Sequence, residues 1–399
     1  MCEKGRYKCL STNITIKPNQ KTMYTKINTQ EGRIMTFWYL PIEPYEERYT
    51  HQLDDWVVQK LKEKEINFIR VEGSQKNPNL IEHGQVLDVI GRPIWCLEQA
   101  KQLLEAISTE KVRHGDKIFT MDIWQFGMEA VAYASQQLGL DLEFYGFNCA
   151  GSFEYYDFIN LTGIGQWGQH LERAWFEFYT KVFFASEKLR NMAFNAGMFS
   201  DKRKAILTGL AFNSQYVLNT VGMPNNDRAF SSLHKSKTVV FPHRYDFEKN
   251  PDVYCDVVEK LSGKGIDFIL TTGRKKLTGT ANYHRANKLA SEGKIHIYEG
   301  LSKIDYYNLL LNSMVVFSSA KQDTIGNCIL EAITLGCTPV VNTGVSYEEF
   351  LPRKYLYTDG CIDEACDLII KYINEPSNAY SYIKRFDKSI DNMIKEMGY

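Results

Sequence analysis

The chain has 399 residues, in which 47 Lys plus Arg balance 48 Asp plus Glu to a formal net charge of −1 at pH 7. Hydrophobic residues make up 44% and charged residues 24%, an ordinary globular composition that excludes a disordered chain. The balanced charge also excludes the strongly basic surface of a dedicated nucleic-acid scaffold, although it allows a local basic face.

The length fits two domains of roughly 150–200 residues each. After a polar lead at 1–32, short apolar strands alternate with amphipathic helices through the first half. Strands are predicted at 33–41, 66–73, 117–124, 142–147, 181–186 and 204–209, and helices at 51–65, 97–108, 127–139, 165–180 and 188–197. Because strict strand–helix alternation is the signature of a parallel sheet, we predict a Rossmann-like N-terminal domain over 33–211.

Residues 212–236 break this rhythm with Asn, Ser, Gly and Pro, and we interpret them as a linker. The alternation restarts with strands at 237–242, 266–273, 294–300, 314–319 and 337–342, and helices at 252–263, 281–293, 303–313 and 327–336. This pattern predicts a second Rossmann-like domain over 237–385. Helices are also predicted at 366–375 and 382–398, and the segment 386–399 is expected to be helical and able to cross back to the N-terminal domain.

The nine cysteines are scattered, and none forms a CxxC pair with zinc spacing. This usage is typical of a reduced, cytoplasmic protein. The lead at 1–32 lacks the apolar core of a secretory signal, and no run approaches the roughly 20 apolar residues that span a bilayer. We therefore expect neither secretion nor membrane insertion.

Ligands of doubly wound sheets bind beyond the carboxyl ends of the strands, so the loops that follow strands are the first places to search. The loop PHRYDFEKNPD at 242–252 carries Arg244 and Lys249 five positions apart, between a strand and a helix. The planar fork of Arg and the point charge of Lys together suit a diphosphate. A solvated turn with surface charges is the alternative for this loop alone.

A second loop lies within SSAKQDTIGNCILEAITLGCTPVV, residues 318–341. Asp323 stands in the loop, and Gly326 opens a helix whose free N–H groups at 325–328 can bind an anion. Glu331 interrupts the apolar face of that helix, and a buried carboxylate needs a partner. Both acids can accept hydrogen bonds from a sugar. The alternatives are a helix-capping role for Asp323 and an ion pair with Lys or Arg for Glu331.

The order and spacing of these motifs, followed by NTGVSYEEFLP at 342–352, resemble the donor half of GT-B glycosyltransferases. More narrowly they are similar to the retaining family-4 type, in which E-x7-E is usual and EAM(A/S)xG(T/C)PVV follows; this chain has D-x7-E and EAITLGCTPVV. Over about 237–355 the likeness is greatest to enzymes that mannosylate the queuosine base of tRNA. The resemblance implies an α/β GT-B fold with two Rossmann-like parallel-sheet domains facing a central cleft.

The resemblance also implies a retaining transfer of a hexose or pentose from a UDP- or GDP-linked sugar, without a metal or another cofactor. Arg244 and Lys249 would bind the diphosphate, Glu331 the ribose hydroxyls, and Asp323 the sugar. Further contacts to the nucleotide sugar would come from Ser318, Ile325, Gly326, Asn327, Cys328, Gly344 and Glu349. Because Asp is one methylene shorter than the usual Glu, the sugar preference can differ.

The N-terminal domain would then hold the acceptor. Arg48 and His51, in the loop after the first strand, form either an acceptor wall or a solvated loop. Asp122 is a candidate acceptor contact or base, with a helix cap as the alternative. Where relatives usually have His, this chain has Asn148, which can bind a sugar but cannot shuttle a proton. The aromatic run FEYYDF at 153–158 follows, and aromatics stack on bases and sugar faces.

A modified nucleobase in tRNA or DNA is the expected acceptor, and the basic clusters at 202–204 and 274–276 are either phosphate contacts or solvated surface. The alternatives are a small-molecule, lipid or surface-glycan acceptor, or a sugar-nucleotide epimerase of the same fold. We would expect such an epimerase to have more acidic and histidine residues in the cleft than this chain offers. A non-enzymatic nucleotide-binding module is disfavoured because Arg244, Lys249 and Glu331 are all present.

Overall fold

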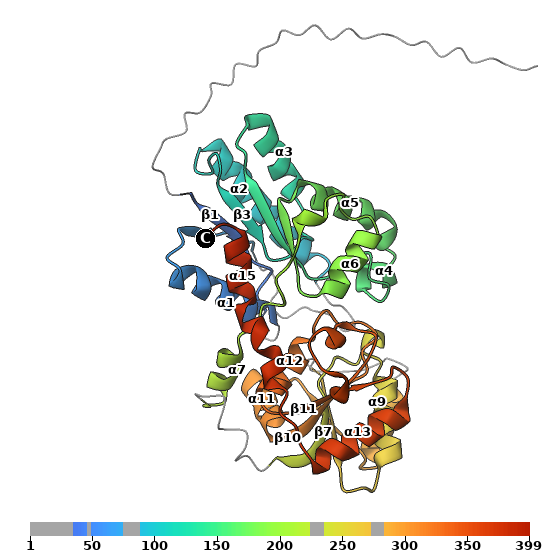
Figure 1. Ribbon diagram of the computed structural model, residues 1–399. Helices are drawn as coiled ribbons and strands as arrows, with labels where there is room; N and C mark the ends of the chain where they lie inside the picture. Colours follow the sequence, from blue (N-terminus) through green and yellow to red (C-terminus); the bar gives the residue numbers. More distant parts are fainter. Residues whose placement is uncertain (1–34, 46–48, 75–87, 224–234, 273–282) are drawn as a thin grey trace, which may run out of the picture. The chain divides into compact units, whose positions relative to one another are not determined.

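The computed structural model describes residues 35–45, 49–74, 88–223, 235–272 and 283–399. Residues Ile34–Tyr399 form one compact unit, which contains two parallel sheets (Figure 1). The predicted lead at 1–32, Arg48, the basic cluster at 274–276 and residues 224–234 of the predicted linker lie outside the described residues.

The first sheet has six parallel strands in the order β2-β1-β3-β4-β5-β6. Its strands are β1 (Phe37–Leu40), β2 (Phe68–Arg70), β3 (Lys117–Thr120), β4 (Glu143–Asn148), β5 (Lys181–Phe184) and β6 (Ala205–Leu207). The register aligns Phe37 with Lys117 and Lys117 with Glu143. Strand order reverses next to β1, so the loops after β1 and β3 leave the sheet side by side at a topological switch point.

Helices alternate with these strands as predicted. They are α1 (Tyr49–Glu63), α2 (Gly91–Ser108), α3 (Met128–Leu138), the short α4 (Phe158–Leu161), α5 (Gly165–Phe178) and α6 (Glu187–Asn195), with a 3-10 turn η1 (Lys202–Lys204) before β6. Local signals set their ends. Ser186 caps α6 by accepting a hydrogen bond from the backbone N–H of Leu189, and α3 ends at Gly139, whose positive φ suits a C-cap.

The second sheet has the order β12-β11-β10-β7-β8-β9, again parallel and again reversing next to its first strand. Its strands are β7 (Ser236–Phe241), β8 (Asp267–Thr272), β9 (His296–Glu299), β10 (Ser313–Ser318), β11 (Thr338–Asn342) and β12 (Leu356–Tyr357). The central strands are nearly continuous apolar runs because helices cover both faces of such a sheet. Val239, Val240 and Phe241 are fully buried, as are Val315 and Val316.

The second group of helices also follows the predicted alternation. It contains α9 (Pro251–Leu261), α10 (Tyr283–Ser291), α11 (Lys303–Asn312), α12 (Asn327–Thr334) and α13 (Ile362–Asn374), with the 3-10 turns η2 (Phe247–Lys249), η3 (Ser346–Glu349) and η4 (Arg353–Tyr355). Pro251 occupies the first position of α9, where its fixed φ is favourable and its missing N–H costs nothing.

Several elements differ from those predicted: the short α4 and β12 were not predicted, and two further regions depart from the expected pattern. Helix α7 (Ser214–Thr220) lies inside the predicted linker; Asn213 caps it and Val217 and Leu218 are fully buried. Seven residues are too few to show a helical period in the sequence. The predicted helix at 382–398 is wrong as one helix, because it is divided into α14 (Tyr380–Ile383), the 3-10 segment η5 (Lys384–Lys388) and α15 (Ser389–Glu396).

The last helix contacts elements of the first sheet. Asp391 of α15 lies 3.3 Å from Lys64 at the end of α1. Lys117 of β3 donates a hydrogen bond to the Met397 carbonyl, and Lys181 of β5 donates one to the Glu396 carboxylate at 2.8 Å. The red helix α15 therefore runs beside the blue helix α1 in Figure 1.

Candidate active site

The switch point of the second sheet brings the two predicted loops together. Because β7 pairs with β10, the loop after β7, with Arg244 and Lys249, begins next to the loop after β10, with Asp323. A backbone hydrogen bond of 2.8 Å from Lys321 N to Glu248 O ties the loops to each other. Arg244 and Asp323, which are 79 positions apart in the chain, thus lie at the same edge of the sheet.

Lys249 is the central cation of this cluster. Its side chain is 13% exposed, and its Nζ donates to the Gln322 carbonyl at 2.8 Å and lies 3.7 Å from carboxylate oxygens of both Asp323 and Glu248. Burial lowers the pKa of Lys249, but Asp323 and Glu248 outweigh it and the net shift is upward. The lysine is therefore a fixed positive charge, and the solvated turn considered from the sequence does not apply to it.

Arg244 shares the same acidic neighbour. Its Nη1 lies 3.2 Å from Asp246, and its Nη2 donates a hydrogen bond to the Glu248 carboxylate. Glu248 therefore stands between the two cations and partly neutralises both. An incoming diphosphate can replace this carboxylate as the anionic partner, because phosphate oxygens match the guanidinium fork at least as well.

A buried hydrogen-bonded chain ends on Asp323. Tyr347 OH donates to Asp323 Oδ2 at 2.9 Å, and Ser318 Oγ lies 2.9 Å from the same phenol oxygen. His243 Nε2 lies 2.9 Å from Ser318 Oγ, and Cys328 Sγ lies 3.4 Å from His243 Nδ1. These groups come from the loops after β7 and β10, from η3 and from α12.

The hydrogen positions in this chain follow from the number of donors that each group has. Tyr347 uses its single proton on Asp323, so Ser318 must donate to Tyr347, and His243 must donate to Ser318 through Nε2. Burial lowers the pKa of His243 to about 3, so the ring is neutral and its Nδ1 accepts from the Cys328 thiol. Each group in the chain therefore donates to the next one in the direction of Asp323. The last donor, Tyr347, orients the Asp323 carboxylate.

Gly326 is the N-cap of helix α12, and any other residue would be strained at this position. Its φ is +86°, and a Cβ there would lie 2.9 Å from Asp323 Oδ2. The helix-capping alternative for Asp323 is wrong, because the N-cap is Gly326 and no side chain caps the helix.

Among the described residues, the backbone N–H groups of Gly326, Asn327 and Cys328 have no hydrogen-bond partner, so they remain available to an anion. Ile325 is fully buried and can offer only its backbone.

Glu331 lies one turn into α12, with its side chain almost completely buried. Lys303 Nζ donates to Glu331 Oε1 at 2.8 Å and Tyr307 OH donates to the same oxygen at 2.7 Å. The ion pair with a lysine, one of the alternatives from the sequence, is thus present. Within the described part of the chain Oε2 accepts no hydrogen bond, so one carboxylate oxygen is still open to a ligand.

Glu349 and Gly344 contact helix α6 of the first half. Glu349 accepts hydrogen bonds from the backbone N–H groups of Glu187 and Lys188, both at 2.8 Å, and Lys188 Nζ bonds the Gly344 carbonyl. A carboxylate at a helix N-terminus satisfies free donors and complements the helix dipole. In this structure Glu349 is occupied by α6, and its contact to a nucleotide sugar stays a prediction.

At the switch point of the first sheet, Asp122 is part of a buried ion cluster. Arg92 of α2 donates to Asp122 Oδ2 and to the Trp124 carbonyl, each at 3.1 Å, and also to Glu43 in the loop after β1. Burial raises the pKa of Asp122 and Arg92 opposes that shift. The cap alternative is wrong, because Gly127 is the N-cap of α3. Arg92 was not predicted, since it lies inside a helix with no motif around it.

The other two acceptor-side residues, Asn148 and His51, lie in different surroundings. Asn148 ends β4 with its side chain fully buried; Nδ2 donates to the Ala150 carbonyl at 2.9 Å, while Oδ1 accepts no hydrogen bond from any residue that the structure describes. The adjacent Cys149 carbonyl accepts from Thr324 Oγ1 at 3.2 Å, so this loop touches the loop of Asp323. His51 instead pairs with Asp55 one turn along α1, at 3.2 Å, and no hydrogen bond or ion pair joins it to another described site residue.

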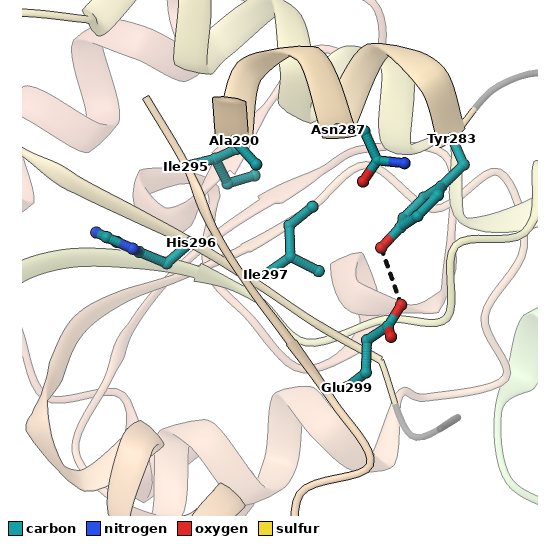
Figure 2. Close-up of a pocket in the computed structure, with 7 residues that line it drawn as sticks. All are labelled: Tyr283, Asn287, Ala290, Ile295, His296, Ile297 and Glu299. Atoms are coloured by element: carbon teal, nitrogen blue, oxygen red, sulfur yellow. Dashed lines mark hydrogen bonds between the residues drawn. The ribbon is translucent and has the colours of Figure 1, made fainter. Parts of the chain in front are cut away.

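A surface pocket lies elsewhere, at the edge strand β9. Figure 2 shows its lining, in which Tyr283 donates a hydrogen bond to Glu299 at 2.9 Å. The lining residues are Tyr283, Asn287, Ala290, Ile295, His296, Ile297 and Glu299, and none of them is a predicted site residue. In the described ranges, no group of three or more His, Cys, Asp or Glu side chains is arranged to hold a metal ion, and no helix is both long and apolar enough to span a membrane.

Comparison with curated proteins gives matches that include a short one to a tRNA-modifying enzyme. No family model matches the chain. Over 121 residues the chain is 29% identical to a Drosophila melanogaster protein named tRNA-queuosine alpha-mannosyltransferase, a stretch that covers 30% of this chain and 32% of the relative. The match thus spans about a third of the curated relative. It confirms the resemblance predicted from the motifs.

Solved structures match over almost the whole chain. HepE from Anabaena in complex with UDP and glucose has a TM-score of 0.61 and 14% identity, covering 91% of this chain and 99% of that one. Sucrose-phosphate synthase from Thermosynechococcus elongatus has a TM-score of 0.61 and 12% identity, with 91% and 97% covered. The lipopolysaccharide outer core galactosyltransferase WaaB, in its apo form, has a TM-score of 0.61 and 12% identity, with 91% and 100% covered. The GT-B fold class is confirmed.

Proposed function

We propose that this protein is a retaining glycosyltransferase that moves a hexose or pentose from a UDP- or GDP-linked sugar to a hydroxyl of a modified nucleobase in tRNA or DNA. The observation that carries the proposal is the convergence of Arg244, Lys249 and Asp323 with the free N–H groups of α12 at one switch point. Two fixed cations and a helix N-terminus are the parts that a diphosphate needs.

The nucleotide would occupy the edge of the second sheet. Arg244, Lys249 and the start of α12 would bind the diphosphate, and the open Oε2 of Glu331 would accept a hydrogen bond from a ribose hydroxyl. Asp323 would face the sugar. The complex of the structurally similar HepE with UDP and glucose supports a nucleotide-sugar ligand for this fold.

In the proposed reaction the bond between the anomeric carbon and the diphosphate oxygen breaks, and a bond to the acceptor oxygen forms on the same face of the sugar. The acceptor proton passes to the departing diphosphate oxygen. Lys249 and Arg244 stabilise the negative charge that grows on this leaving group, which lowers the barrier if they are held in place beforehand. For Lys249, the contacts with Asp323 and with the Gln322 carbonyl supply that preorganisation.

The nucleobase acceptor is supported by the likeness to the tRNA-queuosine enzyme. We also propose that residues 33–211 hold the acceptor and residues 237–385 the nucleotide sugar, and that the protein acts in the cytoplasm, where its acceptor would be. A small molecule, lipid or glycan as acceptor remains an outcome for the experiment.

The test has two parts. Melting temperature should rise with UDP, GDP or one of their sugar conjugates, by several degrees at saturating ligand, and Lys249→Met should lose this rise while the exposed Lys101→Met keeps it. Incubation of the stabilising conjugate with queuosine tRNA, hydroxymethylated DNA and simple alcohols, followed by mass measurement, then identifies the acceptor. Absence of stabilisation by every nucleotide and conjugate would contradict the proposal.

A further inference from the structure

Three exposed or half-buried aromatic rings form a patch that the proposed reaction does not use. We define the aromatic patch as Tyr155, Tyr156 and Phe247, together with Lys321. The rings of Tyr155 and Tyr156 are 4.9 Å apart and perpendicular, and those of Tyr156 and Phe247 are 6.0 Å apart. Lys321 Nζ lies 3.8 Å from the centroid of the Phe247 ring. The patch therefore joins the loop after β4 to the loops after β7 and β10.

Two of the three rings are accessible to a ligand. Tyr155 is 76% exposed and Phe247 is 54% exposed. Single exposed aromatics are common on protein surfaces, but a contiguous group contributed by distant parts of the chain indicates a binding surface. The group here combines residues that are about 90 positions apart.

The loop that carries the two tyrosines is held firmly. Asn160 Nδ2 donates to the carbonyls of Ser152 and Glu154, both at 2.7 Å. Glu172 accepts from the backbone N–H of Ser152 at 3.0 Å and from Trp124 Nε1 at 2.9 Å. Preorganised rings lose little entropy on binding, which favours their use in recognition.

The patch also adjoins the proposed reaction centre. Phe247 is two residues before Lys249, and Lys321 is two residues before Asp323, so each pair of Cα atoms is at most about 7.6 Å apart. Lys249 and Asp323 are themselves in contact at 3.7 Å. A ligand stacked on the patch would place its neighbouring atoms close to the sugar.

We propose that the aromatic patch binds an unstacked base of a single-stranded nucleic acid and thereby presents the acceptor to the sugar; this rests on the proposed function. Flat rings beside one cation are the combination that single-stranded nucleic-acid sites use, with bases stacked on rings and the cation near a phosphate. Because the patch as defined contains one cation, we expect stacking to contribute most of its affinity and the dependence on salt to be weak.

The experiment measures binding of the full chain to fluorescein-labelled 12-mer oligouridine, unfractionated tRNA and an RNA duplex by fluorescence anisotropy. Oligouridine and tRNA should bind, and the duplex should bind more weakly. Because stacking is worth a factor of about 5 to 150 per base, Tyr155→Ala and Phe247→Ala should each raise Kd by an amount in that range. Tyr155→Phe should bind as the unaltered chain does. Lys321→Gln should reduce the slope of log K against log salt by about 0.7.

Tyr133→Ala is the matched control, since Tyr133 is 66% exposed on α3 and lies outside the patch. Equal Kd values for Tyr155→Ala, Phe247→Ala and the unaltered chain, or no binding of either single-stranded probe or tRNA, would overturn the proposal. Stabilisation of the unaltered chain by UDP or GDP conjugates is measured in parallel. If that stabilisation persists while the patch variants bind normally, only the patch proposal fails; if patch-dependent binding occurs without any nucleotide stabilisation, the transferase proposal fails.

Discussion

Tyr347 donates a hydrogen bond to Asp323 Oδ2 at 2.9 Å and so connects the loop after β11 to the loop after β10. Burial and the nearby Asp323 carboxylate raise the pKa of Tyr347 well above its usual value, so the phenol stays protonated. On its other side the phenol oxygen accepts from Ser318. The tyrosine therefore orients a carboxylate that Lys249 also contacts.

Tyr347→Phe removes this donor and leaves the ring in place. A hydrogen bond to a charged group is worth about 1.5–3 kcal/mol, so kcat should fall by about 10- to 100-fold if Asp323 acts on the transferred sugar. KM for the nucleotide sugar should change by less than about 3-fold. Steady-state kinetics check this. Tyr355→Phe is the control, because its buried hydroxyl bonds Ser377 and touches no site residue; an equal loss in both variants would contradict the assignment.

Glu331→Gln tests the predicted ribose contact. The substitution keeps the size of the side chain but removes the charge that pairs with Lys303. We expect the Kd for UDP or GDP to rise by about 10-fold, as for the loss of one charge-assisted hydrogen bond, measured by titration calorimetry. Lys303→Met is the comparison: if it weakens nucleotide binding as much as Glu331→Gln, the ion pair and not a ribose contact accounts for the effect.

Because the carboxyl of Asp157 is buried, we expect the free energy of unfolding to depend on pH. Burial raises the pKa of Asp157 to about 7, although the backbone N–H of Ile159 opposes the shift, and Glu248 adds to it. The folded state then binds this proton up to about pH 7, whereas the unfolded chain releases it near pH 4, so the free energy of unfolding falls as pH rises between these values. The loss from this group is on the order of 4 kcal/mol.

Asp157→Asn should remove this dependence while its Oδ1 still accepts from the Ile159 N–H. Relative to the unaltered chain, the variant should gain stability steadily from pH 4 to pH 7 and not beyond. Urea unfolding at four pH values measures the difference. A difference that does not vary with pH would show that Asp157 titrates normally.

Lys235 contributes to stability at the ends of two helices. Its ammonium lies within hydrogen-bond distance of the carbonyls of Leu311, Ser313 and Leu335, at 2.7, 2.8 and 2.9 Å. Leu311 and Ser313 lie at the carboxyl end of α11 and Leu335 at that of α12, where the last carbonyls of a helix lack partners within it and a cation is favourable. Lys235→Met should lower the free energy of unfolding by about 2–3 kcal/mol. The exposed Lys237→Met on β7 should cost less than about 0.5 kcal/mol.

Arg92 neutralises two buried carboxylates, Glu43 and Asp122. Arg92→Met would leave them uncompensated and should destabilise the fold by about 3–5 kcal/mol. The double substitution Arg92→Met with Glu43→Gln removes one of the stranded charges and should recover part of the loss. Urea unfolding of Arg92→Met, of Glu43→Gln and of the double variant gives the coupling. Strict additivity of the two single substitutions would contradict a direct interaction.

The order of strands and helices can be read from the local pattern. Continuous apolar runs such as Val239–Phe241 have only one favourable environment, a strand covered on both faces. Short elements cannot be predicted in this way. Helix α7 and strand β12 have too few residues for a period to appear, and their formation depends on contacts with distant segments, such as the hydrogen bond from Ser214 to Asp387.

For the site, the resemblance carried by these motifs implied a common ligand for Arg244, Lys249 and Asp323, and the order of strands in a doubly wound sheet decides that their loops adjoin. Side-chain partners could not be predicted in this way. Which group neutralises Glu331, which hydroxyl orients Asp323, and whether Glu349 faces a ligand or caps α6 depend on distances between loops that are far apart in the chain. Burial makes each such partner necessary, but only the packing of the folded chain selects it.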